Sequence, residues 1–211
     1  MGIQDSGPFG GFRKKTGPII GRRVNGMNVI TALHHPSNKP STSAQLDLQE
    51  RFTLLTVFLN KIKPEVKPGF EKYARGRSAL NAAFKYNYPH AFVESGGVLS
   101  LNYPSLVYSR GHVSIVTVLS LSLNSGVLAL SWAVQQESMY CRNTDLARVL
   151  VYDEESEGAL CFPEVANRGQ LGCSVPVPGS FTGKLHCYLS FVSADGKLVG
   201  DSRYLGEVMG S

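Results

Sequence analysis

Long hydrophobic runs are missing from this sequence of 211 residues. No apolar stretch approaches the roughly 20 residues that a helix needs to cross a bilayer, and the N-terminus lacks the apolar segment of a secretory signal. We therefore expect no membrane span and synthesis in the cytoplasm without a signal peptide. An extracellular or virion-like assembly is a destination that this composition leaves open.

Cysteine is scarce and poorly spaced for chemistry. The chain contains no C-x-x-C pair, the spacing that is typical of zinc and redox sites. The histidine pair at 34–35 has no acidic or cysteine neighbour, and adjacent side chains on an extended segment point to opposite sides. We therefore predict no metal site and no cofactor. We expect all four cysteines to be buried and to pack as small hydrophobic side chains. These are Cys141, Cys161, Cys173 and Cys187.

Local signatures of catalysis are also missing. No G-x-S-x-G nucleophile motif occurs, and Phe12 stands where a phosphate loop beginning at Gly7 would need glycine. His90, His112 and His186 are scattered in the sequence and have no evident acidic partner. The acidic run 153–157 lacks the spaced oxygen ligands and the glycine turn of a calcium loop, so it predicts a solvated loop. We expect no enzyme activity.

One segment has a clear helical pattern. Apolar residues recur at steps of three and four over 45–62, which places them on one face of a helix. Thr42 and Gln45 match a capping box, in which each side chain pairs with a backbone N–H of the other residue. The segment predicts a core helix or an assembly helix, with a stripe of Leu48, Phe52, Leu55, Leu59 and Ile62.

The following residues, 63–90, predict shorter structure. Pro64 and Pro68 lack a backbone donor and should end the first helix, and Ser78 is a candidate cap for a second helix that begins at Ala79. Aromatic residues are dense here and could stack on nucleic-acid bases, although packing between helices is the more frequent use of such residues. They are Phe70, Tyr73, Phe84, Tyr86 and Tyr88.

After residue 91 the pattern changes to alternation with a period of two, which is typical of strands. Asp195-Gly196-Lys197 is a strong hairpin signal, and the single tryptophan, Trp132, lies inside a predicted strand. The pattern favours an immunoglobulin-like or fibronectin type III-like β-sandwich. The predicted strands are 113–123, 127–134, 148–152, 173–177, 185–192 and 197–205.

The N-terminal residues are rich in glycine, with Gly17, Gly21 and Gly26 around short β-branched runs. Glycine at this density favours turns and close backbone approach, so the segment predicts an unpaired β-arm or a tight β-meander. The whole chain is then an α+β protein in three parts. We predict a basic glycine-rich β-arm over 1–40, a helical region over 41–90 and a β-sandwich domain over 91–211.

A set of motifs is spread over nearly the whole chain. They are Gly7-Pro8-Phe9-Gly10-Gly11-Phe12, Lys15/Gly17/Gly21/Gly26 with Val29-Ile30, Ser37-Asn38-Lys39-Pro40 with Thr42 and Gln45, Gly69-Phe70 with Tyr73-Ala74 and Gly76, Asn81-Ala82-Ala83, and Ser193-Ala194-Asp195-Gly196-Lys197 with Tyr204-Leu205-Gly206. Together these motifs resemble an uncharacterised bacterial family, domain of unknown function 6266. The sequence departs from the pattern at Lys14, Thr16 and Val24, where the resemblance leads us to expect glycine, valine and tryptophan. The resemblance implies no established activity. The order of β-arm, T-x-x-Q helix and β-sandwich also loosely resembles bacteriophage virion or tail-associated proteins.

Charge is divided unequally along the chain. Residues 1–90 hold 14 Lys and Arg against 5 Asp and Glu, a net charge of +9, whereas residues 91–211 hold 7 against 11, a net charge of −4. Halves of opposite sign can attract each other between subunits, or the basic half can face a polyanion.

We expect a non-enzymatic structural protein that forms a homo-oligomer, such as a filament, a shell or a virion-like component. The alternative is a nucleic-acid-binding protein, and a third hypothesis is an enzyme or carbohydrate-binding module with its site on the sandwich loops. The candidate assembly or polyanion-binding residues are Phe9, Phe12, Arg13, Lys14, Lys15, Arg22, Arg23, Arg75 and Arg77.

Overall fold

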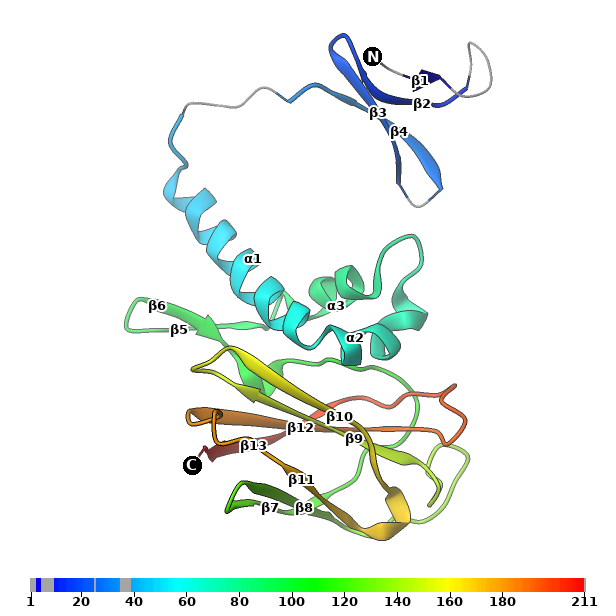
Figure 1. Cartoon of the computed structure of the whole chain (residues 1–211), viewed down its shortest axis with the longest axis vertical. Helices are drawn as coiled ribbons and strands as arrows, with labels where there is room; N and C mark the ends of the chain where they lie inside the picture. Colours follow the sequence, from blue (N-terminus) through cyan, green and yellow to red (C-terminus); the bar gives the residue numbers. More distant parts are fainter. Residues whose placement is uncertain (1–2, 5–9, 25, 35–38, 211) are drawn as a thin grey trace. The chain divides into compact units, whose positions relative to one another are not determined.

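A computed structural model describes residues 3–4, 10–24, 26–34 and 39–210 of the chain (Figure 1). It is a mixed α and β protein in which strands outnumber helices and pair in antiparallel sheets. The chain divides into two compact units, Met1–Leu46 and Asp47–Ser211. The three-part division with boundaries at residues 40 and 90 stays a prediction.

The first unit contains an antiparallel β-meander, one of the two arrangements that the sequence predicts for the arm. Gly17 and Gly26, in the turns before its last two strands, have φ values of 58° and 82°, a left-handed conformation that glycine adopts without a Cβ clash. Neighbouring strands pair in chain order. The strands are β1 (Ile3–Gln4), β2 (Phe12–Thr16), β3 (Ile19–Val24) and β4 (Met27–Ala32).

The first helix begins where the capping box predicts. Thr42 N–H donates to Gln45 Oε1 at 2.9 Å, and Gln45 N–H donates to Thr42 Oγ1 at 3.3 Å. The predicted apolar stripe is buried only at its C-terminal end. At its N-terminal end, Leu48 and Phe52 remain 55% and 56% exposed. The helical elements are α1 (Ser43–Lys61), α2 (Lys63–Phe70), the short 3-10 helix η1 (Glu71–Tyr73) and α3 (Ala79–Asn87).

The first helix ends at Lys61, just before Pro64 and Pro68, as predicted, but a second helix that contains both prolines follows at once. Pro64 lies in the first turn of α2, where the backbone N–H groups have no intrahelical partner in any case. Pro68 lies inside α2, and burial of Val66 and Phe70 keeps the short helix in place. The predicted cap of α3 is confirmed, since Asn81 N–H donates to Ser78 Oγ at 3.2 Å.

Three antiparallel sheets make up the β structure of the second unit. Their strand orders are β10-β9-β12-β13, β11-β8-β7 and β5-β6. The elements are β5 (Phe92–Ser95), β6 (Val98–Leu101), the 3-10 helix η2 (Tyr103–Ser105), β7 (Val118–Asn124), β8 (Val127–Trp132), β9 (Leu146–Asp153), β10 (Gly158–Asn167), the 3-10 helix η3 (Arg168–Gln170), β11 (Gly172–Pro176), β12 (Lys184–Val192) and β13 (Arg203–Met209).

Two predicted strands begin later than the sequence pattern suggests. Strand structure starts at Val118 instead of residue 113, and at Arg203 instead of residue 197. Val113 and Val199 are buried and make only isolated bridges, so their segments show the apolar alternation of strands without a continuous ladder. The strand β10 and the β5-β6 hairpin were not predicted, whereas the long final hairpin of β12 and β13 is confirmed.

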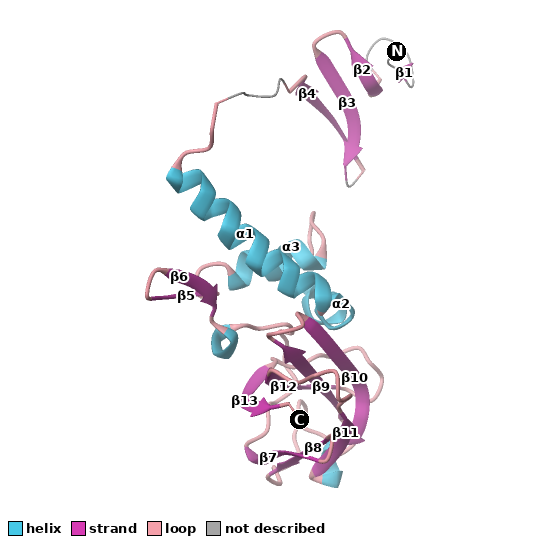
Figure 2. Ribbon diagram, turned by 60° about the vertical axis from the view of Figure 1, so that its left-hand side comes forward, coloured by secondary structure: helices cyan, strands magenta, loops and turns pink. Residues whose placement is uncertain are grey.

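The four-stranded sheet of the second unit, β10-β9-β12-β13, is covered on both faces (Figures 1 and 2). On one face, Leu150 and Tyr152 of β9 share a core with α1, α2 and α3. On the other face, Val149 and Val151 share a core with β8 and β11. Because alternate side chains of a strand point to opposite faces, most residues of β9 and nearly all residues of β12 are buried.

A buried ion pair joins the helices to this sheet. Arg148 Nε of β9 lies 2.9 Å from Glu65 Oε2 of α2, and the Glu65 side chain is almost fully buried. Burial raises the pKa of Glu65, and the nearby Arg148 guanidinium opposes that rise. The cost of removing the Glu65 carboxylate from water is therefore only partly offset by its attraction to Arg148.

Replacing Glu65 should change how stability depends on pH. The folded chain binds the Glu65 proton more tightly than the unfolded chain does, so the contribution of Glu65 to the free energy of unfolding is highest below the ordinary carboxyl pKa. That contribution falls as the pH rises through the raised pKa, and Glu65→Gln should abolish this fall. Urea unfolding from roughly pH 4 to 7, followed by the fluorescence of Trp132, measures it. Parallel wild-type and Glu65→Gln profiles would contradict it, and the exposed control Glu50→Gln should leave the profile unchanged.

Candidate functional site

The predicted arm residues lie on the first two long strands of the N-terminal unit. Five cations on β2 and β3 are exposed, whereas Phe12 is half-buried. Phe9 lies outside the described residues. Lys14 has a φ of 71°, which lies in the left-handed region that favours glycine. The exposed cations are Arg13, Lys14, Lys15, Arg22 and Arg23.

The β3–β4 register mixes polar and aliphatic side chains on both faces of the N-terminal sheet. One face pairs Arg22 with Val29, and the other pairs Gly21 with Ile30. Gly21 is the only buried residue among the described positions of the first unit, and Phe12 lies against it. The sheet therefore presents a basic and partly apolar surface on each side.

Arg75 and Arg77 belong to the second unit, in the turn between η1 and α3. Both are exposed. Arg77 lines a cleft of about 350 Å³, here called the Arg110 cleft. The structure thus divides the predicted residues between the two units. The residues that line the Arg110 cleft are Phe70, Tyr73, Arg77, Ala82, Lys85, Tyr86 and Arg110.

Two contacts position the segment that carries Arg110. Asn87 is fully buried in α3; its Nδ2 donates to Val107 O at 2.8 Å, and its Oδ1 accepts from Val107 N–H at 2.8 Å. Arg110 N–H donates to Gly69 O at 3.0 Å. A Cβ at Gly69 would stand 2.5 Å from Tyr108 O, so glycine permits this close approach of α2.

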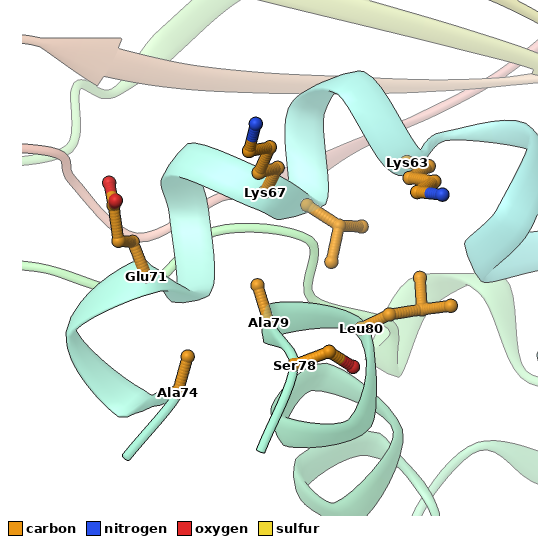
Figure 3. Close-up of a pocket in the computed structure, with 8 residues that line it drawn as sticks. Lys63, Lys67, Glu71, Ala74, Ser78, Ala79 and Leu80 are labelled. Atoms are coloured by element: carbon orange, nitrogen blue, oxygen red, sulfur yellow. The ribbon is translucent and has the colours of Figure 1, made fainter. Parts of the chain in front are cut away.

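A second hollow, of about 380 Å³, lies between α2 and α3. Figure 3 shows Ala79 and Leu80 at the start of α3 opposite Lys63 and Lys67 of α2. Its lining also includes Glu71, so both signs of charge lie at its rim. This arrangement indicates no single class of ligand.

His186 has partners that the sequence did not reveal. Its ring stacks on Tyr103 at a centroid distance of 3.8 Å, and its Nδ1 lies 3.1 Å from Tyr204 OH. Its Nε2 lies 3.5 Å from Glu154 Oε2. The prediction that this histidine lacks an acidic partner is therefore wrong. The partner is Glu154, which lies in the turn after β9. Burial lowers the pKa of His186, and Glu154 opposes that change.

The cysteines are free; Cys141 and Cys187 are buried as predicted, and Cys161 and Cys173 are half-buried. Within the described ranges, no group of three or more His, Cys, Asp or Glu side chains could hold a metal ion. In the same part of the chain, no helix is long and apolar enough to cross a membrane.

The chain belongs to a family of unknown function, DUF6266, whose model matches residues 11–206. The match spans both units and confirms the resemblance found in the sequence motifs. No curated protein matches the chain, and no solved structure matches it.

Loss of the Asn87 side chain should loosen the Arg110 segment. Asn87→Ala would leave the part-buried N–H and C=O of Val107 without these partners, at a cost of about 1–3 kcal/mol in the free energy of unfolding. The matched control is Asn60→Ala, because Asn60 Nδ2 donates to Thr56 O at 2.9 Å in an exposed setting. Urea unfolding of the two variants should show a much larger loss for Asn87→Ala. Equal losses would contradict the positioning role.

Proposed function

We propose that this protein is a non-enzymatic structural protein that assembles with copies of itself through its N-terminal sheet and helices. The observation that carries the proposal is the absence of a core in the N-terminal sheet. Among the described residues of that unit only Gly21 is buried, while Met27 and Ile30 are 62% and 61% exposed. A small β-meander without a covered apolar face is marginal in water, so it gains stability from a partner.

The open edge of the sheet supports the same proposal. Within the described part of the chain, β4 pairs only with β3, so the other edge of β4 offers unpaired backbone groups. Such an edge can accept a strand from another chain through main-chain hydrogen bonds. Aliphatic side chains beside that edge would be covered at the same time.

The opposite charges of the two halves of the sequence favour a second copy as the partner. The N-terminal strands expose cations such as Arg22 and Arg23, and the turn after β9 exposes Glu154, Glu155 and Glu157. Attraction between such surfaces favours association at low ionic strength. The exposed N-terminal half of α1 provides a further apolar surface, with Leu48 and Phe52 on it.

An immunoglobulin-like or fibronectin type III-like identity of the two larger sheets in the second unit, β10-β9-β12-β13 and β11-β8-β7, is part of this proposal. It is supported by antiparallel pairing throughout both sheets and by Trp132, which packs edge-on against Phe191 at 5.5 Å in their shared core. In such an assembly, each copy would present the β-sandwich of its second unit on the outside.

Neutralising two arm cations should weaken the assembly. Arg22 and Arg23 point to opposite faces of β3, so Arg22→Gln with Arg23→Gln lowers the positive charge on both faces. Light scattering at low salt should show a smaller mean mass than for the wild type, and high salt should reduce the difference. Deletion of residues 1–40 should give a folded monomer.

The matched control removes two exposed cations from the second unit, with Arg142→Gln and Lys184→Gln. It should keep the wild-type mass. A wild-type monomer at high concentration and low salt, or a wild-type mass after deletion of residues 1–40, would show that the proposed assembly through the arm is wrong.

A further inference from the structure

The Arg110 cleft places an arginine against two tyrosine rings. The guanidinium carbon of Arg110 lies 4.1 Å from the centroid of the Tyr86 ring and 4.8 Å from that of Tyr73. Phe70 is buried beneath, with its ring centroid 6.0 Å from that of each tyrosine. The two rings and the guanidinium are therefore held by a packed floor, and their arrangement exists before any ligand binds.

The charge of the cleft is not neutralised from within. Arg77, Lys85 and Arg110 line it, no carboxylate does, and none of the three forms an ion pair with another described residue. Asp201, which lies near this segment, accepts a hydrogen bond from Gly111 N–H at 2.9 Å. Ring contacts use the face of a guanidinium, and its N–H groups at the edge remain available to an anion.

Three other arginines of the second unit are paired with carboxylates. Arg51 lies 3.0 Å from Asp47, Arg148 lies 2.9 Å from Glu65, and Arg168 lies 3.3 Å from Asp145. Each of these cations meets a carboxylate of its own chain. Arg168 is buried, and Arg51, Arg148 and Arg110 are half-buried. The fold therefore pairs its other buried or half-buried arginines with acids and leaves the cations of the Arg110 cleft for a partner that brings negative charge.

The tyrosines add a second requirement on that partner. Tyr73 and Tyr86 are 41% and 37% exposed, so part of each ring can be covered by a flat group. A phosphate alone would use the cations and leave the rings uncovered. Nucleic-acid bases stack on such rings whatever their sequence, while arginine and lysine bind the backbone phosphates.

Neighbouring charges favour a polymer over a single nucleotide. Lys72 and Arg75 are exposed on either side of Tyr73 in the chain, outside the lining of the cleft. Cations that continue beyond a pocket match successive phosphates along a backbone. We propose that the Arg110 cleft binds single-stranded nucleic acid, with bases stacked against Tyr73 and Tyr86 and phosphates held by Arg77, Lys85 and Arg110.

The test uses the full chain and a fluorescein-labelled single-stranded thymidine oligomer, with fluorescence anisotropy measured over a series of salt concentrations. Wild-type affinity should fall as salt rises. Arg110→Gln should weaken binding by about tenfold or more, and it should reduce the slope of log affinity against log salt by roughly 0.7 for one lost phosphate contact. The matched control Arg142→Gln removes an exposed cation elsewhere in the second unit and should change neither quantity.

A ring variant separates nucleic acid from other polyanions. Tyr86→Leu should weaken binding of the oligomer between roughly 5- and 100-fold and should change competition by inorganic polyphosphate much less, whereas Tyr86→Phe should keep wild-type affinity. Unfolding curves from Trp132 fluorescence would confirm that each variant is folded. The proposal is overturned by no binding at low salt, by equal effects of Arg110→Gln and Arg142→Gln, or by equal effects of Tyr86→Leu on the oligomer and on polyphosphate.

Discussion

Burial of both faces of one strand pair is the constraint on which the second unit depends. β9 and β12 lie side by side, and their alternate side chains enter two different cores. A sheet of this kind cannot be stable with one face in water, because a continuous apolar strand would then expose half of its side chains. The helices and the sheet of β7, β8 and β11 each cover one face, and the Glu65–Arg148 pair crosses the helical side of that arrangement.

The same need for burial divides the cations into two groups: those paired with carboxylates inside the fold and those that can bind a partner. Cations at the edges of the cores are matched by carboxylates, as Arg168 is by Asp145, because an unpaired charge is costly away from water. Exposed cations carry no such requirement. Five of them lie on the N-terminal sheet, which has almost no core of its own, and others lie around the Arg110 cleft, where tyrosine rings take the place of carboxylates. The two proposals concern these two surfaces, and each can fail without the other.

The parts of the candidate sites were visible in the sequence to different degrees. The aromatic residues of 70–88 raised both helix packing and base stacking, and the structure shows packing for Phe70 and exposed rings at Tyr73 and Tyr86. Arg110 was not predicted, because it comes from an irregular segment that reaches the tyrosines only after α2 and α3 have packed. The Glu154–His186 contact was missed for a similar reason, since the two residues lie 32 positions apart in sequence and meet only when β9 and β12 pair.

Motifs spread along the chain identified the family, and local patterns by themselves determined the start of α1, the cap of α3, the glycine turns of the arm and the final hairpin. Each depends on residues a few positions apart, whose steric and hydrogen-bonding preferences act within one turn of chain. Tertiary structure alone decided that 63–70 is helical despite two prolines, that Val113 and Val199 are buried outside continuous strands, and that Leu48 and Phe52 remain exposed. Apolar spacing shows which residues can be buried, but the elements that assemble around each side chain decide which of them are, because burial is a property of the packed chain.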